Sequence, residues 1–302
     1  MNPDAAATPW TRRHWLCGAG AFSLAGCTIN PDQDHAGADA PSSGALPRAP
    51  RVAWVFSSGG PRGLVHVGVL KGLTELGLKP DLIVGASAGA VIGSLWAARV
   101  PMHTLETLAL ELRPWRLARL SLTGSAWLSG AALADYVRDL IHEQAHATLL
   151  QELPVSMVCV AQRIADGAVV GFDRGDVGLA VQASAAIEGE FSPVRIRGQR
   201  YMDADLRMPL PVRLARALGA TRVLAVDASA HEDQTPPGAE RWHESDLRKR
   251  ALTAPDAQLA DVLLHPQFGY WVGVSREYRE RAIGAGYRDT MAAADRLRAL
   301  HG

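Results

Sequence analysis

The stretch DLIVGASAGAVIGS, residues 81–94, decides the fold, because it passes from a strand to a helix through a short turn of small residues. The apolar run before the turn predicts a buried strand, and the pattern after it predicts a helix through Ala98. At the turn, Ser87 lies between Gly85 and Gly89, in the pattern GxSxG. Such a serine is either an exposed nucleophile or part of a tight connection, and this motif alone leaves both interpretations open.

Strands and helices alternate outward from this turn. The apolar runs predict strands over 52–56, 81–84, 155–161, 168–172, 194–202 and 222–228. The helical patterns cover 64–76, 103–112, 131–146, 177–187 and 211–218, and a mainly helical C-terminus follows a polar loop. This alternation predicts an α/β fold of three layers, α/β/α, with a mostly parallel central sheet covered on both faces. Ligands of such sheets bind at the carboxyl ends of the strands.

The composition is that of a globular protein with a large core. The chain has 302 residues, of which 48% are hydrophobic. Lys and Arg together number 31, as do Asp and Glu, so the formal charge is zero. Without a basic field, nucleic acid is not an expected partner.

The N-terminus reads as an export signal. An apolar run from Trp15 to Ala25 follows Arg12-Arg13 and is too short to span a bilayer, so residues 1–26 are interpreted as a signal peptide. The sequence TRRHWL resembles a twin-arginine signal, and LAGC, ending at Cys27, resembles a lipobox.

We therefore expect a lipidated Cys27, a flexible tether over 27–50 rich in Pro, Ser and Gly, and a folded domain over 51–302. This interpretation places the protein in the cell envelope, anchored on the periplasmic side, at the outer membrane rather than the inner one. The alternative is a cytosolic protein with an irregular N-terminus. Once Cys17 is removed and Cys27 acylated, Cys159 stands alone in an apolar run, as a small core residue.

Two further stretches add chemistry to the turn. SSGGPRGLVHVGVL, residues 57–70, places Gly59, Gly60 and Gly63 after a strand and at the start of a helix, where backbone amides can approach an anion closely. Neither GxGxxG nor GxxxxGK[ST] occurs there, which argues against a nucleotide site. In YMDADLRMPLP, residues 201–211, Asp203 follows a strand and lies in a turn, where a carboxylate can accept a serine proton. A nucleophile with an oxyanion hole is what acyl transfer requires.

Over residues 51–302 these motifs, in this order, resemble the bacterial patatin-like phospholipases. The matching stretches are the glycine-rich loop with Arg62, Gly63, His66 and GVL, then KPDLIVGASAGA, ASAAIEGEFSPV, YMDADLRMPLPV, ADVLLHP and AGY. The resemblance implies a Ser-Asp dyad without histidine that cleaves acyl esters of lipids, with a phospholipid or other acyl-ester lipid as substrate. It implies Ser87 as nucleophile, Asp203 as general base, and the loop Gly59-Gly60-Pro61-Arg62-Gly63 as oxyanion hole, with no metal or cofactor.

The chain departs from the family pattern at three places near this dyad. Ser58 stands where the family has a third glycine, and Ala204 where it has the glycine of Asp-Gly. Met208 stands where a polar residue is expected. We expect Ser58 to crowd the oxyanion hole and Ala204 to restrict the turn that aims Asp203, because alanine resists positive φ. The alternative function is thus a membrane-tethered lipid-binding protein of the same fold with impaired catalysis.

Histidines suggest two competing sites. His142 and His146 form the zinc-protease pattern HExxH, but the apolar stripe Leu133, Val137, Leu140 and Ile141 places both on the polar side of the helix, which favours a solvated face. A Ser-Asp-His triad remains possible, since three histidines follow Asp203 in the chain. Two lie in the polar loop after 228 and one follows a strand; they are His231, His243 and His265. His66 is interpreted as a core histidine satisfied by hydrogen bonds.

The segment RPWRLARLSLTGSAWLSG, residues 113–130, has two interpretations. Its alternation of Trp115, Trp127 and leucines with arginines suits a membrane-facing cap over the active site. It equally suits an ordinary helix that packs on the domain with its arginines in water.

Overall fold

The computed structural model describes residues 33–113, 116–121 and 126–302. The predicted signal peptide, 1–26, and Cys27 lie outside the described residues, as does Trp115.

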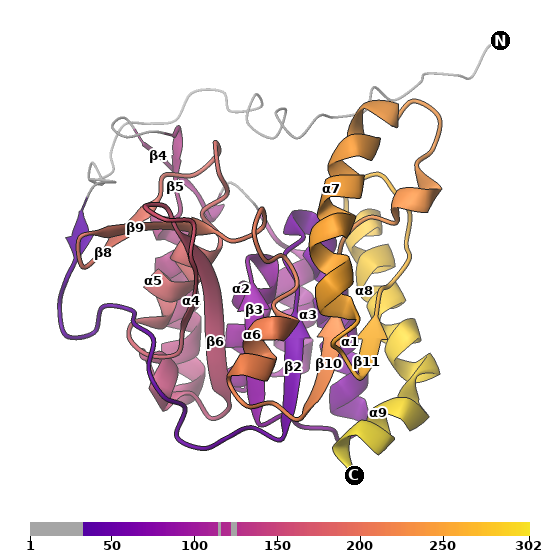
Figure 1. The fold of residues 1–302 in the computed structure, drawn as a ribbon, viewed down its shortest axis with the longest axis horizontal. Helices are drawn as coiled ribbons and strands as arrows, with labels where there is room; N and C mark the ends of the chain where they lie inside the picture. The colour runs from indigo at the N-terminus through magenta and orange to yellow at the C-terminus, as the bar shows by residue number, and fades with distance from the viewer. Residues whose placement is uncertain (1–32, 114–115, 122–125) are drawn as a thin grey trace.

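One large sheet forms the centre of the molecule (Figure 1). Its strands follow the order β1-β8-β9-β6-β3-β2-β10-β11, and β7 also pairs with β6. The run from β6 to β11 is parallel, whereas β7 and β9 are antiparallel to β6, so the expected mostly parallel sheet is confirmed. The strands of this sheet are β1 (Asp34–His35), β2 (Val52–Phe56), β3 (Leu82–Ala86), β6 (Ser156–Arg163), β7 (Val169–Phe172), β8 (Val194–Ile196), β9 (Gln199–Asp203), β10 (Arg222–Val226) and β11 (Val262–Leu264).

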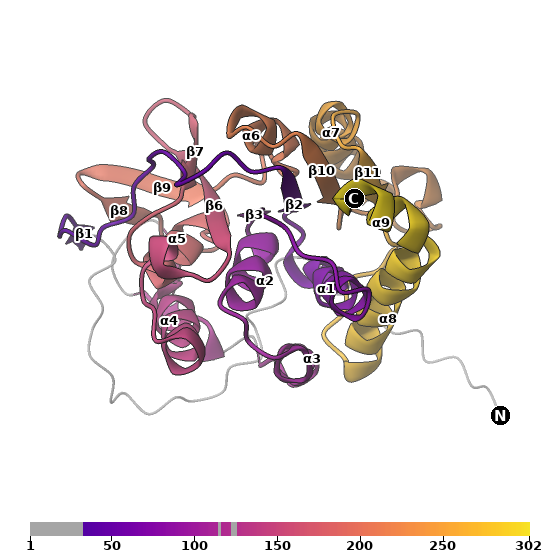
Figure 2. The same ribbon diagram turned by 90° about the horizontal axis from the view of Figure 1, so that it is seen from below.

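Helices cover both faces of the sheet. Seen from below, α1, α2, α5 and α8 lie on one side of it and α6 and α7 on the other (Figure 2). The α-helices of the described residues are α1 (Val65–Glu75), α2 (Ala88–Ala97), α3 (Met102–Leu110), α4 (Ala131–Ala145), α5 (Val177–Ser184), α6 (Val212–Ala217), α7 (Glu240–Ala257), α8 (Arg276–Ala292) and α9 (Ala294–His301). Short 3-10 turns occupy η2 (Gly60–Leu64), η4 (Leu150–Glu152) and η5 (Glu232–Gln234). The three-layer α/β/α architecture is thus the one that the sequence predicts. None of the helices among these residues is both long and apolar enough to cross a bilayer.

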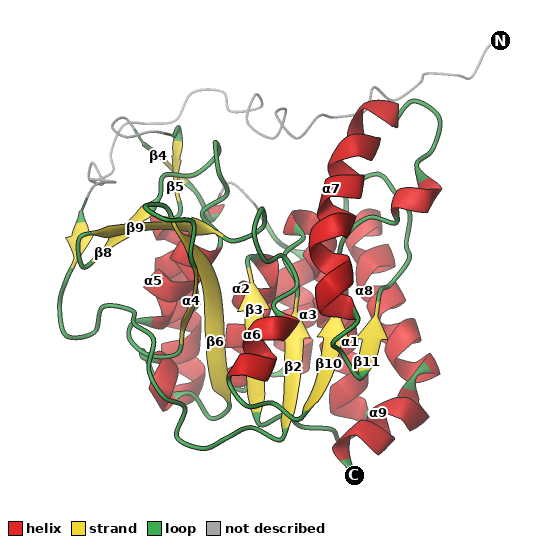
Figure 3. Ribbon diagram, in the orientation of Figure 1, coloured by secondary structure: helices red, strands yellow, loops and turns green. Residues whose placement is uncertain are grey.

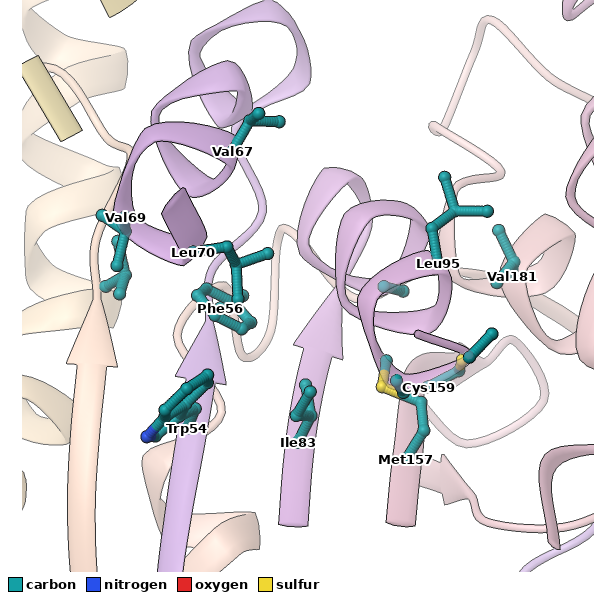
Figure 4. Packing of buried hydrophobic residues seen from close by; sticks show 14 of the residues in the cluster. Trp54, Phe56, Val67, Val69, Leu70, Ile83, Leu95, Met157, Cys159 and Val181 are labelled. Atoms are coloured by element: carbon teal, nitrogen blue, oxygen red, sulfur yellow. The ribbon is translucent and has the colours of Figure 1, made fainter. Parts of the chain in front are cut away.

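The sheet has a hydrophobic core on each face. Successive side chains of each central strand point to opposite faces, so they pack in different cores. In β2, Trp54 and Phe56 pack under α1 and α2, while Ala53 and Val55 pack against the face with α6. Figure 4 shows the first core, in which Trp54, Phe56, Ile83, Met157 and Cys159 meet residues of the helices. Burial on both faces explains why these strands are continuous apolar runs in the sequence.

Residues 33–50 differ from the expected flexible tether, because they lie on the domain. Asp34–His35 forms β1 and pairs in parallel with β8, and Ser42 bridges to Arg174. Ala40 is buried. The folded part therefore begins before Arg51.

Two other segments depart from the predicted elements. The single strand expected over 194–202 is a hairpin of β8 and β9, because Arg197 and Gly198 both adopt positive φ, 50° and 76°, in a tight turn. The described part of 113–130 contains an antiparallel pair, β4 (Arg119–Leu120) and β5 (Leu128–Ser129), rather than a packed helix (Figure 3). Leu120 of β4 and Trp127, the residue before β5, are 71% and 78% exposed.

Candidate active site

Ser87 occupies a strained turn at the carboxyl end of β3. Its φ of 53° and ψ of −119° are rare for a residue with a side chain, and α2 begins at the next residue, Ala88. A non-glycine residue holds such a conformation only where its surroundings enforce it. The turn therefore has the strained geometry by which a strand-to-helix elbow presents a nucleophilic serine.

The two flanking glycines are required by close backbone contacts. A Cβ on Gly85 would lie 2.4 Å from the carbonyl oxygen of Gly89, and a Cβ on Gly89 would lie 2.3 Å from that of Phe56. Both distances are far shorter than van der Waals contact, so any side chain here would force β3, α2 and β2 apart. This steric requirement explains the GxSxG pattern.

Ser184, near the end of α5, holds the backbone of the turn. Its hydroxyl accepts a hydrogen bond from the N–H of Ser87 at 2.9 Å and donates one to the carbonyl oxygen of Val160 at 2.6 Å. Ser184 is fully buried. Sequence reasoning did not single out this residue, although it lies in the quoted motif ASAAIEGEFSPV.

The register of the sheet brings Asp203 to the level of Ser87. Ala86 pairs with Val160 of β6, and the next residue of that strand, Ala161, pairs with Asp203 of β9 on its other side. The Ser87 hydroxyl lies near enough to the Asp203 carboxylate, across β6, to lower the pKa of Asp203 as a donor. The two predicted residues, separated by over a hundred positions in the chain, thus meet at one edge of the sheet.

Burial sets the acidity of Asp203. The side chain is 5% exposed, and desolvation raises the pKa of Asp203 to about 7, with the neighbouring charge of Asp205 acting in the same direction. Hydrogen bonds from the Ser87 hydroxyl and the backbone N–H of Asp205 oppose this rise, as does the charge of Lys249. A carboxylate with a pKa near neutrality is well suited to accept and return a proton.

The glycine-rich loop lies between Ser87 and the end of β10. A Cβ on Gly59 would lie 2.9 Å from the Ala228 Cβ, and one on Gly63 would lie 2.4 Å from the Ala88 Cβ. Gly60 has a φ of +52°, which glycine adopts without strain. The loop therefore passes very close to the residue after Ser87.

Three of the five residues predicted for the oxyanion hole have no free amide hydrogen there. Pro61 has no N–H, and the N–H of Arg62 donates to the carbonyl oxygen of Gly59 at 3.1 Å within the turn η2. The N–H of Gly63 also lies inside this 3-10 turn, whose bonds run from each N–H to the carbonyl oxygen three residues before it. Gly59 and Gly60 stay the candidates for donors to an oxyanion.

The Arg62 side chain instead fastens the loop. It is buried and donates hydrogen bonds to the carbonyl oxygens of Ala228, Gly269 and Tyr270 at 2.9–3.2 Å. Its guanidinium also lies 4.5 Å from the centre of the Phe268 ring. Burial lowers the pKa of Arg62 from its usual value.

The three departures from the family pattern have structural explanations. The buried hydroxyl of Ser58 donates a hydrogen bond to the carboxylate of Asp205. Ala204 is absent from the described residues with positive φ, so the turn needs no glycine, and its methyl group packs in the core beside α6. The expected restriction at Ala204 is therefore wrong. Met208 is half-buried, and its N–H donates to the carbonyl oxygen of Ala204.

The histidines of the competing triad bond elsewhere. His265 Nε2 contacts the Ser229 carbonyl oxygen at 3.0 Å, and the His265 ring stacks on that of His231 with 3.8 Å between centres. His243 lies in α7 rather than in the predicted loop, and its Nδ1 contacts Thr235. The residues that these histidines contact lie in the segments after β10 and β11, whereas Ser87 lies at the end of β3.

The remaining histidine and cysteine predictions concern α4, α1 and β6. His142 and His146 are exposed, and among the described residues no group of three side chains suited to hold a metal is present. His66 is buried as expected; it contacts the Ser57 carbonyl oxygen through Nε2, while its Nδ1 has no hydrogen-bond partner among the described residues. Burial lowers the pKa of His66 to about 4 and raises that of the Cys159 thiol to about 12, which confirms Cys159 as an inert core residue.

Fold and site together define an α/β protein with a serine on a strained elbow, a buried carboxylate beside it and a glycine-rich loop over both. The family profile described as patatin-like phospholipase matches residues 54–216, more than half of the chain. The chain belongs to the patatin-like phospholipase family.

Similar sequences agree with this assignment, and a solved structure shares the fold. An NTE family protein of Mycobacterium tuberculosis is 33% identical over 186 residues, which cover 61% of this chain and 51% of the relative. A protein of Emericella nidulans named lysophospholipase nte1 is 30% identical over 192 residues, covering 62% of this chain and 12% of that protein. The chain thus spans about half the length of the mycobacterial relative. VipD from Legionella pneumophila has the same fold, with a TM-score of 0.55 at 15% identity over 83% of this chain and 67% of VipD.

Proposed function

We propose that the protein is a serine acyl hydrolase of the phospholipase A, lysophospholipase or esterase type, which cleaves acyl esters of membrane lipids with a Ser87-Asp203 dyad. The observation that carries this proposal is the sheet register, which places the strained Ser87 and the buried Asp203 at the same level on either side of β6. Family membership and the relatives named as lysophospholipases support a lipid ester as the substrate.

The geometry suits a two-step acyl transfer. The Ser87 oxygen attacks the carbonyl carbon of the ester while Asp203 takes the hydroxyl proton. Amides of the loop at Gly59 and Gly60, with the first amides of α2, stabilise the oxyanion. The intermediate collapses and expels the alcohol portion of the lipid, which receives the proton from Asp203. Water then attacks the acyl-serine, Asp203 takes its proton, and the fatty acid leaves as Ser87 recovers its hydrogen.

Turnover of acyl esters by the wild type, Ser87→Ala and Asp203→Asn tests this dyad. Ser94→Ala is a matched control, because Ser94 is also buried, lies on α2 and pairs its hydroxyl with the Cys159 sulfur, at 3.6 Å, rather than with the dyad. We expect both dyad variants to be folded by circular dichroism and inactive, and Ser94→Ala to be active. A wild type that binds phospholipid vesicles without hydrolysing any ester of a broad panel would favour the binding function instead.

Membrane attachment through a lipidated Cys27 is the second part of the proposal, with export by the twin-arginine route to the periplasmic side of the outer membrane. The lipobox-like sequence before Cys27 supports it. Leu120 and Trp127, which are exposed beside Arg119, suit contact with a lipid surface. Labelling with a fatty-acid analogue should disappear in Cys27→Ser, and unchanged labelling would refute the anchor.

A further inference from the structure

A polar cluster joins three segments above the sheet. Ser58 lies in the loop after β2, Asp205 in the loop after β9, and Lys249 on α7. The Asp205 carboxylate accepts hydrogen bonds from the Ser58 hydroxyl and from the Lys249 ammonium group. Lys249 also donates to the Ser58 oxygen at 2.8 Å, so each member contacts the other two.

The cluster is directly connected to the candidate active site. The backbone N–H of Asp205 donates to Asp203 Oδ1 at 2.9 Å. The N–H of Ser58 donates to the carbonyl oxygen of Pro209 at 2.8 Å, and Gly59 follows as the first glycine of the loop. A displacement of Asp205 or Ser58 would therefore move either the base or the oxyanion loop.

Polar contacts hold α7 in place. Of its 18 residues only Thr253 and Asp256 are buried, and Asp256 accepts hydrogen bonds from the backbone and side chain of Arg213. Lys249 precedes these residues by four and seven positions, so the three share one face of the helix. Figure 1 shows α7 extending beyond the carboxyl ends of the strands, where Ser87 and Asp203 lie. Lys249 thus ties the part of α7 above the sheet to the site.

We propose that Lys249, Asp205 and Ser58 form a positioning network that fastens α7 to the two loops of the dyad and balances the charge beside Asp203; this inference rests on the proposed function. Asp205 places a negative charge near the base, and Lys249 neutralises it. The ion pair is only partly exposed, at 18% for the Lys249 side chain and 34% for that of Asp205, so solvent screens it incompletely.

Besides the Asp205–Lys249 ion pair, several groups surround Asp203. The Ser87 hydroxyl lies near the carboxylate, Ala161 pairs with Asp203 from β6, and the Ala186 carbonyl oxygen accepts the Asp203 N–H. Among the charged residues of the adjoining loops, Glu188 and Arg207 are exposed and Glu190 is half-buried. Burial and Asp205 raise the pKa of Asp203, and Lys249 lowers it.

The pH profile of kcat/KM distinguishes this network from a merely structural one, because Lys249→Met and Asp205→Asn should shift it in opposite directions. Asp203 acts as a base only when ionised, so activity falls below its pKa. Lys249→Met removes the stabilising charge and should move the acidic limb of kcat/KM upward by about half a pH unit or more, which is about a threefold loss on that limb. Asp205→Asn retains the backbone N–H but removes the negative charge, and should move the limb downward. Lys249→Arg should keep the wild-type profile.

Lys71→Met is the matched control, because Lys71 forms a similarly exposed ion pair with Glu106, between α1 and α3. It should leave the profile unchanged. Shifts of the same sign in the two site variants, or no shift in either while both remain folded, would overturn the network.

A second readout separates this inference from the proposed function. Carbon NMR of protein labelled at the aspartate carboxyl groups, with the Asp203 signal assigned by Asp203→Asn, follows the same titration without turnover. If Ser87→Ala remains active, or the wild type is inactive, the proposed function fails. The opposite NMR shifts would still support the network, and their absence would still refute it.

Discussion

Replacing Ser184 with alanine should lower the free energy of unfolding by about 2–4 kcal/mol and reduce kcat at least tenfold. The Ser184 hydroxyl bonds the N–H of Ser87 and the carbonyl oxygen of Val160, and all three residues are at least 95% buried. Truncation leaves one buried donor and one buried acceptor without their partner, at a cost of about 1–3 kcal/mol each. The range of 2–4 kcal/mol allows for partial relaxation.

The loss of activity has a separate cause. The positive φ of Ser87 stores strain of order 1–3 kcal/mol, and the hydrogen bond from its N–H helps to hold it. Without that bond the turn can relax and withdraw the hydroxyl from Asp203. A loss of about 1.4 kcal/mol in transition-state stabilisation corresponds to a factor of ten in rate.

Urea unfolding followed by circular dichroism, together with kcat on an acyl ester, measures both effects. Ser94→Ala provides the comparison, because it removes a buried hydroxyl that contacts only a thiol. We expect its destabilisation to stay below about 1 kcal/mol. If Ser184→Ala were no less stable and no less active than Ser94→Ala, Ser184 would not hold the turn.

Three further predictions concern the loop and the buried titratable groups. Gly63→Ala should destabilise the fold by about 1–3 kcal/mol and lower turnover, because its Cβ would lie 2.4 Å from that of Ala88, whereas Gly37→Ala, with no heavy atom within 4 Å, should have little effect in the same urea assay. In the folded wild type the pKa of His66 is about 4, against 6.5 in the unfolded chain, so the free energy of unfolding falls as the pH drops from 6.5 to 4. His66→Gln should reduce that loss by up to about 3 kcal/mol. An unchanged pH dependence of stability would contradict a buried, neutral His66. Asp203 affects the pH dependence of stability in the opposite direction, because its pKa is raised in the folded protein. Its contribution to folding is present at low pH and is lost as the pH rises through 7. Asp203→Asn should therefore be about 1–3 kcal/mol more stable than wild type at pH 8 and equal to it near pH 4.

Most of the fold follows from local pattern. The strands that were predicted within two residues, such as β2 and β3, are buried on both faces and read as apolar runs between glycine-rich turns. The hairpin at Arg197-Gly198 was missed because a two-residue turn interrupts the apolar pattern only briefly. The polar composition of residues 27–50 predicts a tether, yet β1 within this segment is held by backbone pairing with β8, which composition does not reveal.

The sequence predicts only those parts of the candidate site where the backbone geometry requires a particular residue type, such as glycine. The glycines around Ser87, and Gly59 and Gly63 in the loop after β2, are dictated by contacts of less than 3 Å with neighbouring backbone or Cβ atoms. Gly60 is dictated by its positive φ instead, so together they form a recognisable pattern. Ser184 and Lys249 carry no such mark, because a serine in a small-residue helix and a lysine in a polar helix are ordinary residues. Their roles depend on the register of β6 and on the position of α7, which only the folded chain defines.

The departures at Ser58 and Ala204 acquire meaning once their contacts are considered together with those of Asp205. Taken singly, Ser58 places a side chain beside the oxyanion loop, and Asp205 places a negative charge beside a base. In the folded chain the hydroxyl of Ser58 and the ammonium group of Lys249 both bind the Asp205 carboxylate, so the side chain that would crowd the loop helps to accommodate the added charge. Ala204 fits the same arrangement, because its buried methyl group anchors the turn between Asp203 and Asp205. These substitutions are therefore better understood as an interlocked alternative to the glycines of the family than as independent losses, and such an alternative is compatible with a working dyad.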